Sequence, residues 1–448
     1  MLSLKKRIYE ALPIALQKRI TKTLSLNPYK KNTVSDTIQN IEFNYSKLQK
    51  DYGFFVETVN KNMNSIFNTA KHFSPFWKER LKNIKQLNLS NLELLEPIDS
   101  SDLRLNFDDL IAGNFKGYLT STGGTGRNPT KLYLSDESYY QDIAHFIWSF
   151  SKIGYTPDEK KMTLRGKNLS SKLTIENPVF NELLVNIFAM NNMNSDKMLK
   201  NIVKYNPSYG HGYPSAFVRM SKLFPNISEH ISLKGIILAS ENVNSTQKEI
   251  ITNAFKCEVI SFYGHSERAA FATQLPGKGE DYYILPSYGL IEVLNENNQR
   301  VKEGEIGEIV CTGFLNKAMP LFRYKTGDFA EVKRTHQDIP IVLNKIIGRW
   351  GKDFAINKNG EKISTTSINI HSKEQYKYKY IQLWQNQPGS IEIKLVPWVQ
   401  NRMDSHSIKN LQREFKDKMD DMDVLIKIVE ENNIYKTKTG KVPYFVKT

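Results

Sequence analysis

The sequence predicts an α/β fold with mixed, largely parallel sheets and a smaller C-terminal part. Between about residues 138 and 255, helical stretches alternate with short apolar runs, a pattern typical of a parallel sheet covered by helices. From 288 to 332, two strand-like runs are joined by polar, turn-rich sequence, which predicts a small β-barrel-like part. Beyond about residue 345 the chain becomes lysine-rich and ends in short strands and helices, so we expect a small α+β domain there.

The length of the chain predicts more than one domain. A single hydrophobic core usually stops growing well before 448 residues. We expect a helical region over residues 1–97 that belongs to the large domain. The remainder of the large domain follows at 98–347, and a small C-terminal domain at 348–448.

The composition is ordinary for a globular protein, except for its charge. Hydrophobic residues make up 40% and charged residues 24%, while the formal net charge is +15. This excess favours an acidic partner such as a nucleotide, a nucleic acid, an anionic lipid or a charged substrate. The lysines are dispersed and no zinc-finger or RNA-recognition signature accompanies them, so we expect no nucleic-acid partner. Cys257 and Cys311 lie in apolar runs, which suits buried thiols in the cytoplasm better than a disulfide.

The first part of the chain is predicted to be helical. Apolar residues at 3.6-residue spacing occur in the segment YGFFVETVNKNMNSIFNTAKHF, and nearer the N-terminus they recur every four positions among lysines and arginines. The residues of this second stripe are Leu4, Ile8, Leu12, Leu16, Ile20 and Leu24. Charge within the stripe argues against a signal peptide, and no apolar run approaches the roughly 20 residues of a membrane span. We expect the stripe either to pack on the protein body or to contact the inner face of a membrane.

A loop rich in glycine and hydroxyl residues follows a polar lead-in, EPIDSSDLRLN. Backbone without bulky side chains can curl until several N–H groups point at one anion, and Ser and Thr add further donors. The loop therefore indicates a phosphate site, with a surface turn as the alternative. Its spacing fits neither a Walker A loop nor a dinucleotide fingerprint. The candidate residues are Ser121, Thr122, Gly123, Gly124, Thr125 and Gly126.

The apolar run CEVISFYG ends at Tyr263 and Gly264 and is followed by Glu267. Ligands of open α/β folds bind at the carboxyl ends of the strands. The ring of Tyr263 could stack there on a base, and Glu267 beside a phosphate site could hold magnesium. A structural strand-to-helix turn is the alternative. We assign His265 no acid–base role, and GHSER lacks the last glycine of a nucleophile elbow.

Three further segments carry candidate residues. Asp328, in PLFRYKTGDF, could take the hydroxyls of a ribose or cap its own turn. Lys441, in YKTKTGKVPYF, lies among lysines that are equally typical of solvated charge. The segment YGHGYPSAF contributes Tyr209, His211 and Tyr213, which suit a pocket for a polar acid or an aromatic core.

Taken in chain order, these segments resemble the adenylate-forming superfamily, in particular its phenylacetate–CoA ligase-like branch, which includes capsular polysaccharide biosynthesis proteins. The phosphate loop of that branch is similar to STGGTGRNPT, its G-A-E-P segment to ILASENV, and its Y-G-x-[ST]-E motif to FYGHSE. The P-L-x-R-Y-R-T-G-D block of that branch resembles PLFRYKTGD in this chain. The hinge motif of the branch resembles IIGRWGKDFAINKNGEKIS, and its terminal lysine motif resembles KTKTGKV. The match spans about Glu96 to Val442, and several weak motifs in the correct order make a strong one.

The resemblance implies a mobile C-terminal lid domain and a role for each candidate residue. The loop would hold the β- and γ-phosphates of ATP, and Tyr263 would stack on adenine. Further nucleotide contacts would come from Ser240, Glu241, Gly264, Ser266, Asp328 and Arg349. Glu267 would hold magnesium, and Lys441 would neutralise charge between the attacking carboxylate and the α-phosphate. The hinge would turn on Lys352, or on Asp353 if one residue is inserted.

The function that the resemblance implies is ATP-dependent activation of a carboxylic or amino acid to an adenylate, with release of pyrophosphate. The acyl group would then pass to coenzyme A or to an amino sugar of a surface polysaccharide. The sequence departs from the family pattern at three places. Gly124 replaces a hydroxyl residue, Arg127 and Asn128 replace a lysine, and Lys325 replaces an arginine. The alternatives are an inactive nucleotide-binding scaffold in a membrane-associated polysaccharide assembly complex and, third, a nucleic-acid binder.

Overall fold

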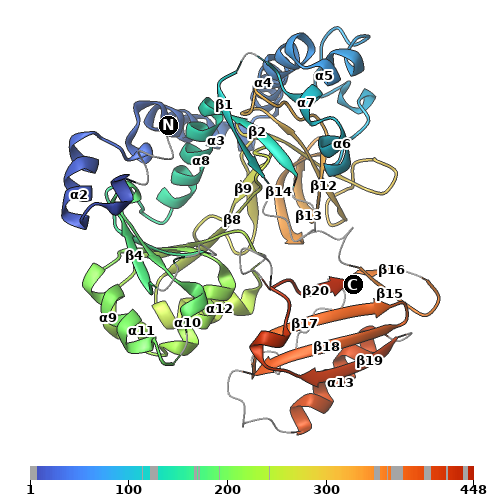
Figure 1. The fold of residues 1–448 in the computed structure, drawn as a ribbon. Helices are drawn as coiled ribbons and strands as arrows, with labels where there is room; N and C mark the ends of the chain where they lie inside the picture. The colour runs from blue at the N-terminus through green and yellow to red at the C-terminus, as the bar shows by residue number, and fades with distance from the viewer. Residues whose placement is uncertain are drawn as a thin grey trace. The chain divides into compact units, whose positions relative to one another are not determined.

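The computed structural model describes residues 8–113, 115–121, 130–165, 169, 172–190, 192–241, 243–347, 354–360, 362–364, 377–397, 405–419, 422–436 and 442–447. The chain divides into two units, each with its own hydrophobic core (Figure 1). The first comprises Met1–Thr326 and Ala330–Ile346, and the second comprises Gly327–Phe329 and Ile347–Thr448.

Helices form most of the described chain between residues 8 and 80, and two short helices follow at 100–110. They are α2 (Ile14–Thr23), α3 (Asn32–Lys50), α4 (Tyr52–Phe73), α5 (Pro75–Arg80), α6 (Ser100–Leu105) and α7 (Phe107–Leu110). The helix α4 covers the segment in which apolar residues recur with a period of 3.6 residues. It begins after Asp51, whose side chain accepts a hydrogen bond from the Phe54 N–H. The lead-in before α6 folds into a capping box in which Asp99 and Asp102 each accept from the other's backbone N–H.

A twelve-stranded sheet runs through the first unit in the order β11-β12-β13-β14-β10-β9-β8-β7-β6-β3-β5-β4. Its first six strands in sequence are β3 (Lys161–Leu164), β4 (Thr174–Asn177), β5 (Glu182–Val185), β6 (Tyr209–Gly212), β7 (Gly235–Leu238) and β8 (Glu258–Gly264). The others are β9 (Phe271–Thr273), β10 (Tyr282–Ile284), β11 (Gly289–Leu294), β12 (Ile306–Gly313), β13 (Tyr324–His336) and β14 (Ile339–Ile347). The predicted parallel part consists of β5, β3, β6, β7 and β8, and the two strands predicted after residue 288 are the antiparallel pair β11 and β12.

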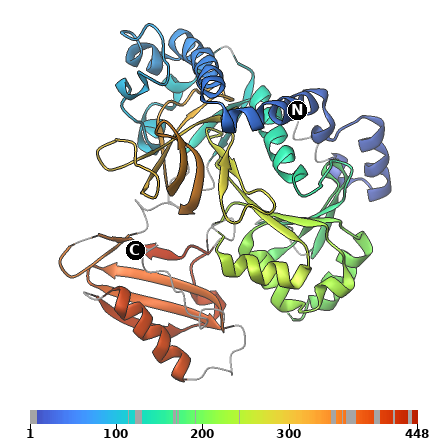
Figure 2. The same ribbon diagram turned by 180° about the vertical axis from the view of Figure 1, so that it is seen from behind.

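Helices cover both faces of the parallel strands (Figures 1 and 2). On one face, α8 (Asp136–Ser151) packs Ile147 and Phe150 against Ile237 and Ile260. On the other face, the core includes Ile236 and side chains of the surrounding helices. Those helices are α9 (Ser195–Tyr205), α10 (Pro214–Leu223), α11 (Ile227–His230) and α12 (Ser245–Phe255). The apolar runs of these strands are continuous because both faces are buried.

The second unit is a small α+β structure, as predicted. Its four-stranded sheet has the order β19-β18-β17-β20, and a separate hairpin pairs β15 with β16. The bounds are β15 (Phe354–Ile356), β16 (Lys362–Ser364), β17 (Tyr378–Gln387), β18 (Ser390–Pro397), α13 (Ser405–Lys418), β19 (Asp423–Ile428) and β20 (Phe445–Lys447). Leu411 and Phe415 of α13 share a buried core with Leu383 and Ile393 of the sheet.

A buried ion pair fixes the segment that leads into β13. Arg323 and Glu292 of β11 are almost fully buried, and Arg323 Nε lies 3.1 Å from Glu292 Oε2. Arg323 Nη1 also donates to the Leu95 carbonyl (2.8 Å), and the Arg323 carbonyl accepts from the Ile98 N–H (3.1 Å). The arginine therefore holds the lead-in segment beside the start of β13.

Replacing Arg323 should be costly because Glu292 would stay buried with only one cationic partner, Arg300, whose Nε lies 3.3 Å from Glu292 Oε1, and because the Leu95 carbonyl would lose its donor. We expect Arg323→Met to lower the free energy of unfolding by about 3–5 kcal/mol, measured by urea denaturation. The control is Lys333→Met, which removes an exposed lysine 2.7 Å from Asp281 and should change stability little. Equal losses in the two variants would contradict this account.

His211 in β6 should make stability depend on pH. Its Nδ1 donates to the Ile237 carbonyl (3.2 Å), and its ring packs on Phe146 and Phe262. Burial, and next the charge of Arg165, lower the pKa of His211 well below its usual value. Below pH 6.5, His211 binds a proton in the unfolded chain but stays neutral in the folded chain. The free energy of unfolding therefore falls by up to about 1.4 kcal/mol for each pH unit.

The matched comparison is His211→Asn against His230→Asn, since His230 is exposed. Urea denaturation at pH 7 and pH 5 should show a smaller acid loss in His211→Asn than in the wild type. The His230 variant should keep the wild-type loss. An unchanged acid loss in His211→Asn would contradict the assignment.

Candidate functional site

Several predicted site residues lie at one edge of the sheet. In the parallel register Gly212 pairs with Leu238, and Leu238 pairs with Ser261, so β6, β7 and β8 end close to the same level. Tyr213 follows β6, while Ser240 and Glu241 follow β7. Tyr263 and Gly264 end β8 itself. This edge is where open α/β folds bind ligands.

The turn after β7 is shaped by Ser240 and Glu241. Ser240 has φ +67°, which is uncommon for a residue with a side chain and turns the chain sharply. The carboxylate of Glu241 accepts from the backbone N–H (3.1 Å) and the hydroxyl (3.0 Å) of Ser215, in the first turn of α10. The Glu241 side chain thus links the ends of β6 and β7.

Glu267 lies in a buried network just beyond β8. The Tyr324 hydroxyl donates to Glu267 Oε1 (2.9 Å), and His265 Nδ1 donates to Oε2 (3.0 Å). On the other side of the imidazole ring, Cys311 Sγ lies 3.6 Å from His265 Nε2. The predicted magnesium ligand is therefore joined to the first residue of β13.

The ionisation of this network follows from its hydrogen bonds. Burial alone would raise the pKa of Glu267, but His265 and the Tyr324 hydroxyl lower it to about 2. Burial alone would lower the pKa of His265, but the Cys311 sulfur and the Glu267 carboxylate raise it. Glu267 therefore carries a negative charge at neutral pH.

Asp328 lies in β13, four residues beyond Tyr324. Between them, the Thr326 hydroxyl donates to the Ile309 carbonyl (2.8 Å) and Gly327 has φ +73°. This glycine allows a local change of direction in the strand immediately before Asp328. The Asp328 side chain is half-buried, and Ser266 is exposed.

The three residues predicted for an acid pocket are divided between two cores. Tyr209 is 1% exposed and packs edge-on against Phe150 and Tyr155. His211 lies on the same face, against α8, whereas Tyr213 belongs to the core beneath α9 to α12. The pocket role of this trio stays a prediction.

Several predicted residues lie outside the described part of the chain. They are Thr122, Gly123, Gly124, Thr125, Gly126, Arg349, Lys352, Asp353 and Lys441. Ser121 ends β1 (Gly117–Ser121), which pairs antiparallel with β2 (Lys131–Ser135). Because Ser121 pairs with Lys131, the two ends of the phosphate-loop segment are neighbours.

Arg268 is a site-building residue that the sequence did not identify. Its Nη2 donates to the Tyr118 hydroxyl in β1 (2.8 Å), and its Nη1 donates to the Ser138 hydroxyl in α8 (3.1 Å). Its Nε lies 3.3 Å from Asp142 Oδ2. Arg268 thus ties the segment after Glu267 to the strand that precedes the glycine-rich loop. The sequence motif GHSER contains this arginine, but no local pattern predicts its distant partners.

Two searches of the described residues bear on metals and membranes. No group of three or more His, Cys, Asp or Glu side chains among these residues could hold a metal ion. In the same part of the chain, none of the helices combines the length and the apolar character needed to cross a membrane.

The comparisons with known proteins agree with this architecture. No family model matches the sequence. The chain is similar to protein CapK of Staphylococcus aureus, with 26% identity over 381 residues that cover 80% of this chain and 82% of CapK. It is also similar to the solved structure of 2-hydroxyisobutyryl-CoA ligase in complex with 2-HIB-AMP, with a TM-score of 0.67, 13% identity and coverage of 88% of this chain and 89% of that chain.

A third relative is an acyl acid amido synthetase solved in complex with 2,4-DB. Its TM-score is 0.60 at 14% identity, and the match covers 87% of this chain and 91% of that chain. The solved relatives named here are thus a CoA ligase and an amide-forming synthetase, which agrees with the predicted enzyme class. The predicted fold is confirmed, because this chain shares the fold of 2-hydroxyisobutyryl-CoA ligase and of the acyl acid amido synthetase.

Proposed function

We propose that this protein activates a carboxylic or amino acid with ATP and transfers the acyl group to coenzyme A or to an amino sugar. In the first step a carboxylate oxygen bonds to the α-phosphorus of ATP, and the bond to the β-phosphate oxygen breaks, so pyrophosphate leaves. In the second step a thiol or amine attacks the acyl carbon, loses its proton, and AMP leaves. The supporting observation is the shared edge of β6, β7 and β8, joined through Glu267 to β13.

The nucleotide roles follow from this placement and from the resemblance. Tyr263 stacks on adenine at the end of β8, and the backbone after β7 meets its edge. Asp328 takes the ribose hydroxyls, together with Arg349. Ser121 and the following loop hold the phosphates, while Lys441 reaches the reacting centre on a lid that turns at Lys352 or Asp353. Such chemistry depends on positioning and charge stabilisation.

The residues present fit magnesium. Glu267 is an anionic oxygen ligand, and Mg²⁺ is usually bound by one or two carboxylates together with substrate phosphates and water. Bound there, the ion would neutralise phosphate charge. Ser266 lies next to Glu267 on the exposed side of the same turn.

The acceptor is proposed as one of two classes, because the relatives include both. 2-Hydroxyisobutyryl-CoA ligase was solved with 2-HIB-AMP and CoA, and the amido synthetase forms an amide. The name CapK, together with the sequence resemblance to capsular polysaccharide biosynthesis proteins, favours an amino sugar of a surface polysaccharide. The proposed acid pocket of Tyr209, His211 and Tyr213 rests on the sequence, because the structure divides these three residues between two cores.

The decisive test is ATP–pyrophosphate exchange with pooled carboxylic and amino acids, using Lys441→Ala. We expect exchange in the wild type and a loss of about 100- to 1,000-fold in the variant, because one charge-stabilising group is removed from the transition state. Nucleotide binding should persist. The control is Lys427→Ala, which removes a lysine 2.6 Å from Glu392 in the same unit. ATP binding without exchange across the panel would favour the inactive scaffold.

We also propose that the N-terminal segment contacts the inner face of an anionic membrane. Of the large apolar side chains between residues 8 and 26, Ile8 is 58% exposed, Leu16 41% and Leu24 62%. The buried residues of α2 are instead Gln17 and Thr21. Gln17 Nε2 donates to the Leu12 carbonyl (2.8 Å), and the Thr21 hydroxyl bonds to Tyr9, so these polar groups face inward. The described residues of the apolar stripe therefore do not all pack on the protein body.

The charge of this surface matches anionic lipid. The helix α2 contains Lys18, Arg19 and Lys22 and no acidic residue. Lys18 bonds to Glu176 of β4 (2.6 Å), while Arg19 and Lys22 are exposed beside Leu16 and Leu24. Exposed apolar side chains flanked by basic residues are typical of helices that lie in a membrane interface.

Vesicle co-sedimentation tests this contact. We expect binding to phosphatidylcholine vesicles that contain phosphatidylglycerol, weaker binding at high salt, and little binding to pure phosphatidylcholine. Leu16→Gln with Leu24→Gln should weaken vesicle binding at least about tenfold, because the membrane can then no longer bury these two exposed leucines. The control is Leu94→Gln with Leu105→Gln, at leucines 72% and 84% exposed elsewhere. Equal effects of both pairs, or no binding at all, would contradict the proposal.

A further inference from the structure

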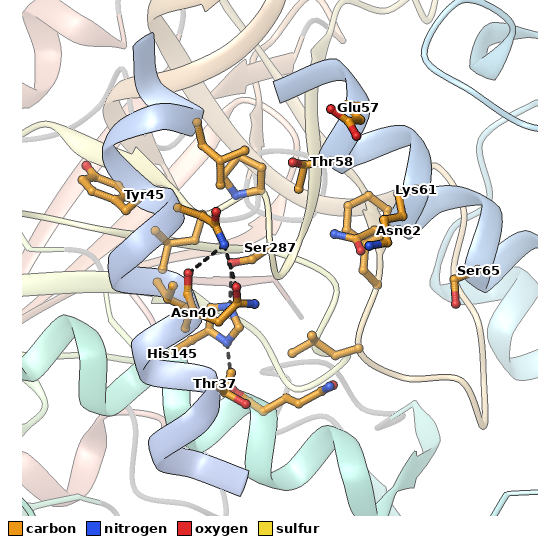
Figure 3. Close-up of a pocket in the computed structure, with 18 of the residues that line it drawn as sticks. Thr37, Asn40, Tyr45, Glu57, Thr58, Lys61, Asn62, Ser65, His145 and Ser287 are labelled. Carbon is orange, nitrogen blue, oxygen red and sulfur yellow. Dashed lines mark hydrogen bonds between the residues drawn. The ribbon is translucent and has the colours of Figure 1, made fainter. Parts of the chain in front are cut away.

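A pocket of about 480 Å³ lies in the first unit, lined by α3, α4, α8 and residues 285–287 and 314–317 (Figure 3). None of its lining residues belongs to the nucleotide-binding set. Its volume lies within the range of small-molecule sites. The pocket therefore needs an explanation of its own.

The sides of α3 and α4 that line the pocket are mixed, and each carries a polar stripe beside apolar residues such as Ile41, Leu48 and Phe54. From α3 the pocket receives Thr37, Asn40 and Asn44, which recur at intervals of three and four residues on one face. From α4 it receives Thr58, Asn62 and Ser65 at the same intervals. Consecutive helices normally bury apolar stripes against their neighbours. Here the two polar stripes line an open pocket, as expected for a surface that meets a polar ligand.

Hydrogen bonds within the wall fix what it presents. Asn44 Nδ2 donates to Asn40 Oδ1 (2.6 Å) and to the Asn40 carbonyl (3.0 Å). These bonds use the donor group of Asn44 and the acceptor group of Asn40. The pair therefore offers an acceptor, Asn44 Oδ1, and a donor, Asn40 Nδ2, one helical turn apart.

The floor of the pocket is also set by hydrogen bonds. His145 is 1% exposed, and its Nδ1 donates to the Gln141 carbonyl (2.8 Å). Its Nε2 lies 2.9 Å from Ser287 Oγ and accepts that hydroxyl proton. Burial lowers the pKa of His145 to about 4, so the ring is neutral near pH 7. Because the Ser287 hydroxyl donates its proton to His145, its oxygen can only accept hydrogen bonds from a ligand.

The remaining lining adds flat apolar surface and a few charges. Phe54 and Phe314 line the pocket, with Glu57, Lys61 and Lys317 as its charged members. Aromatic faces suit the C–H faces of sugar rings, and alternating donors and acceptors suit hydroxyl groups, which do both. An aliphatic chain would leave the amides and hydroxyls desolvated without partners. We propose that this pocket binds a carbohydrate of one or two rings.

The test is calorimetric titration of the full chain, without ATP, with N-acetylglucosamine and with glucuronic acid. Hexanoate is titrated as the apolar acid. We expect at least one sugar to bind, and Asn44→Ala with Asn62→Ala to weaken it about tenfold or more through the loss of direct hydrogen bonds. Binding of neither sugar, or loss of hexanoate binding in this variant, would overturn the proposal.

The matched control is Gln39→Ala with Asn68→Ala. These exposed amides lie on the same two helices but do not line the pocket. Alanine favours helix at all four positions, so both double variants should fold, and their melting curves check this. Equal weakening by the control pair would overturn the proposal. Because ATP is absent, the outcome is independent of whether the adenylation chemistry is correct.

Discussion

The hydrogen bond from the Tyr324 hydroxyl to Glu267 is the interaction on which the candidate site depends. It joins the segment that leaves β8 to the first residue of β13, so Tyr263 and Asp328 lie on strands whose ends are tied together. A buried carboxylate is costly unless it is fully paired, and His265 supplies the second bond. The neighbouring Arg323 anchors the same strand from the other side, through its buried pair with Glu292.

This network leaves Glu267 able to act as a ligand. A carboxylate has about four lone-pair sites, and Glu267 accepts hydrogen bonds from Tyr324, from His265 and from the backbone N–H of Glu267 itself. These bonds come from donors that favour the ionised form, so the charge is held in a fixed orientation before any ligand arrives. Preorganised charge of this kind needs no rearrangement at the moment of reaction.

Local patterns in the sequence were enough for the elements, but not for the links between them. The 3.6-residue spacing predicted α4, and the short apolar runs predicted β7 and β8. The bonds of Arg268 to Tyr118 and Ser138 join residues more than a hundred positions apart, and no period in the sequence records them. The N-terminal apolar stripe does not predict the buried side of α2. Hydrogen bonds of Gln17 and Thr21 place these polar residues on the inward side instead.

The features that lack a nucleotide role are concentrated in the N-terminal helices. The family motifs begin near Glu96, whereas the polar pocket and the exposed apolar surface both draw on residues 8–65. Geometry would constrain the proposed nucleotide site, because its strand ends, its carboxylate and its loop would have to meet around one nucleotide. Helices outside that site are under no such constraint and can change to suit a particular acceptor or location. Specific function in a widely used fold resides in particular surfaces, and these helices contribute to the two surfaces that the proposed nucleotide site does not use.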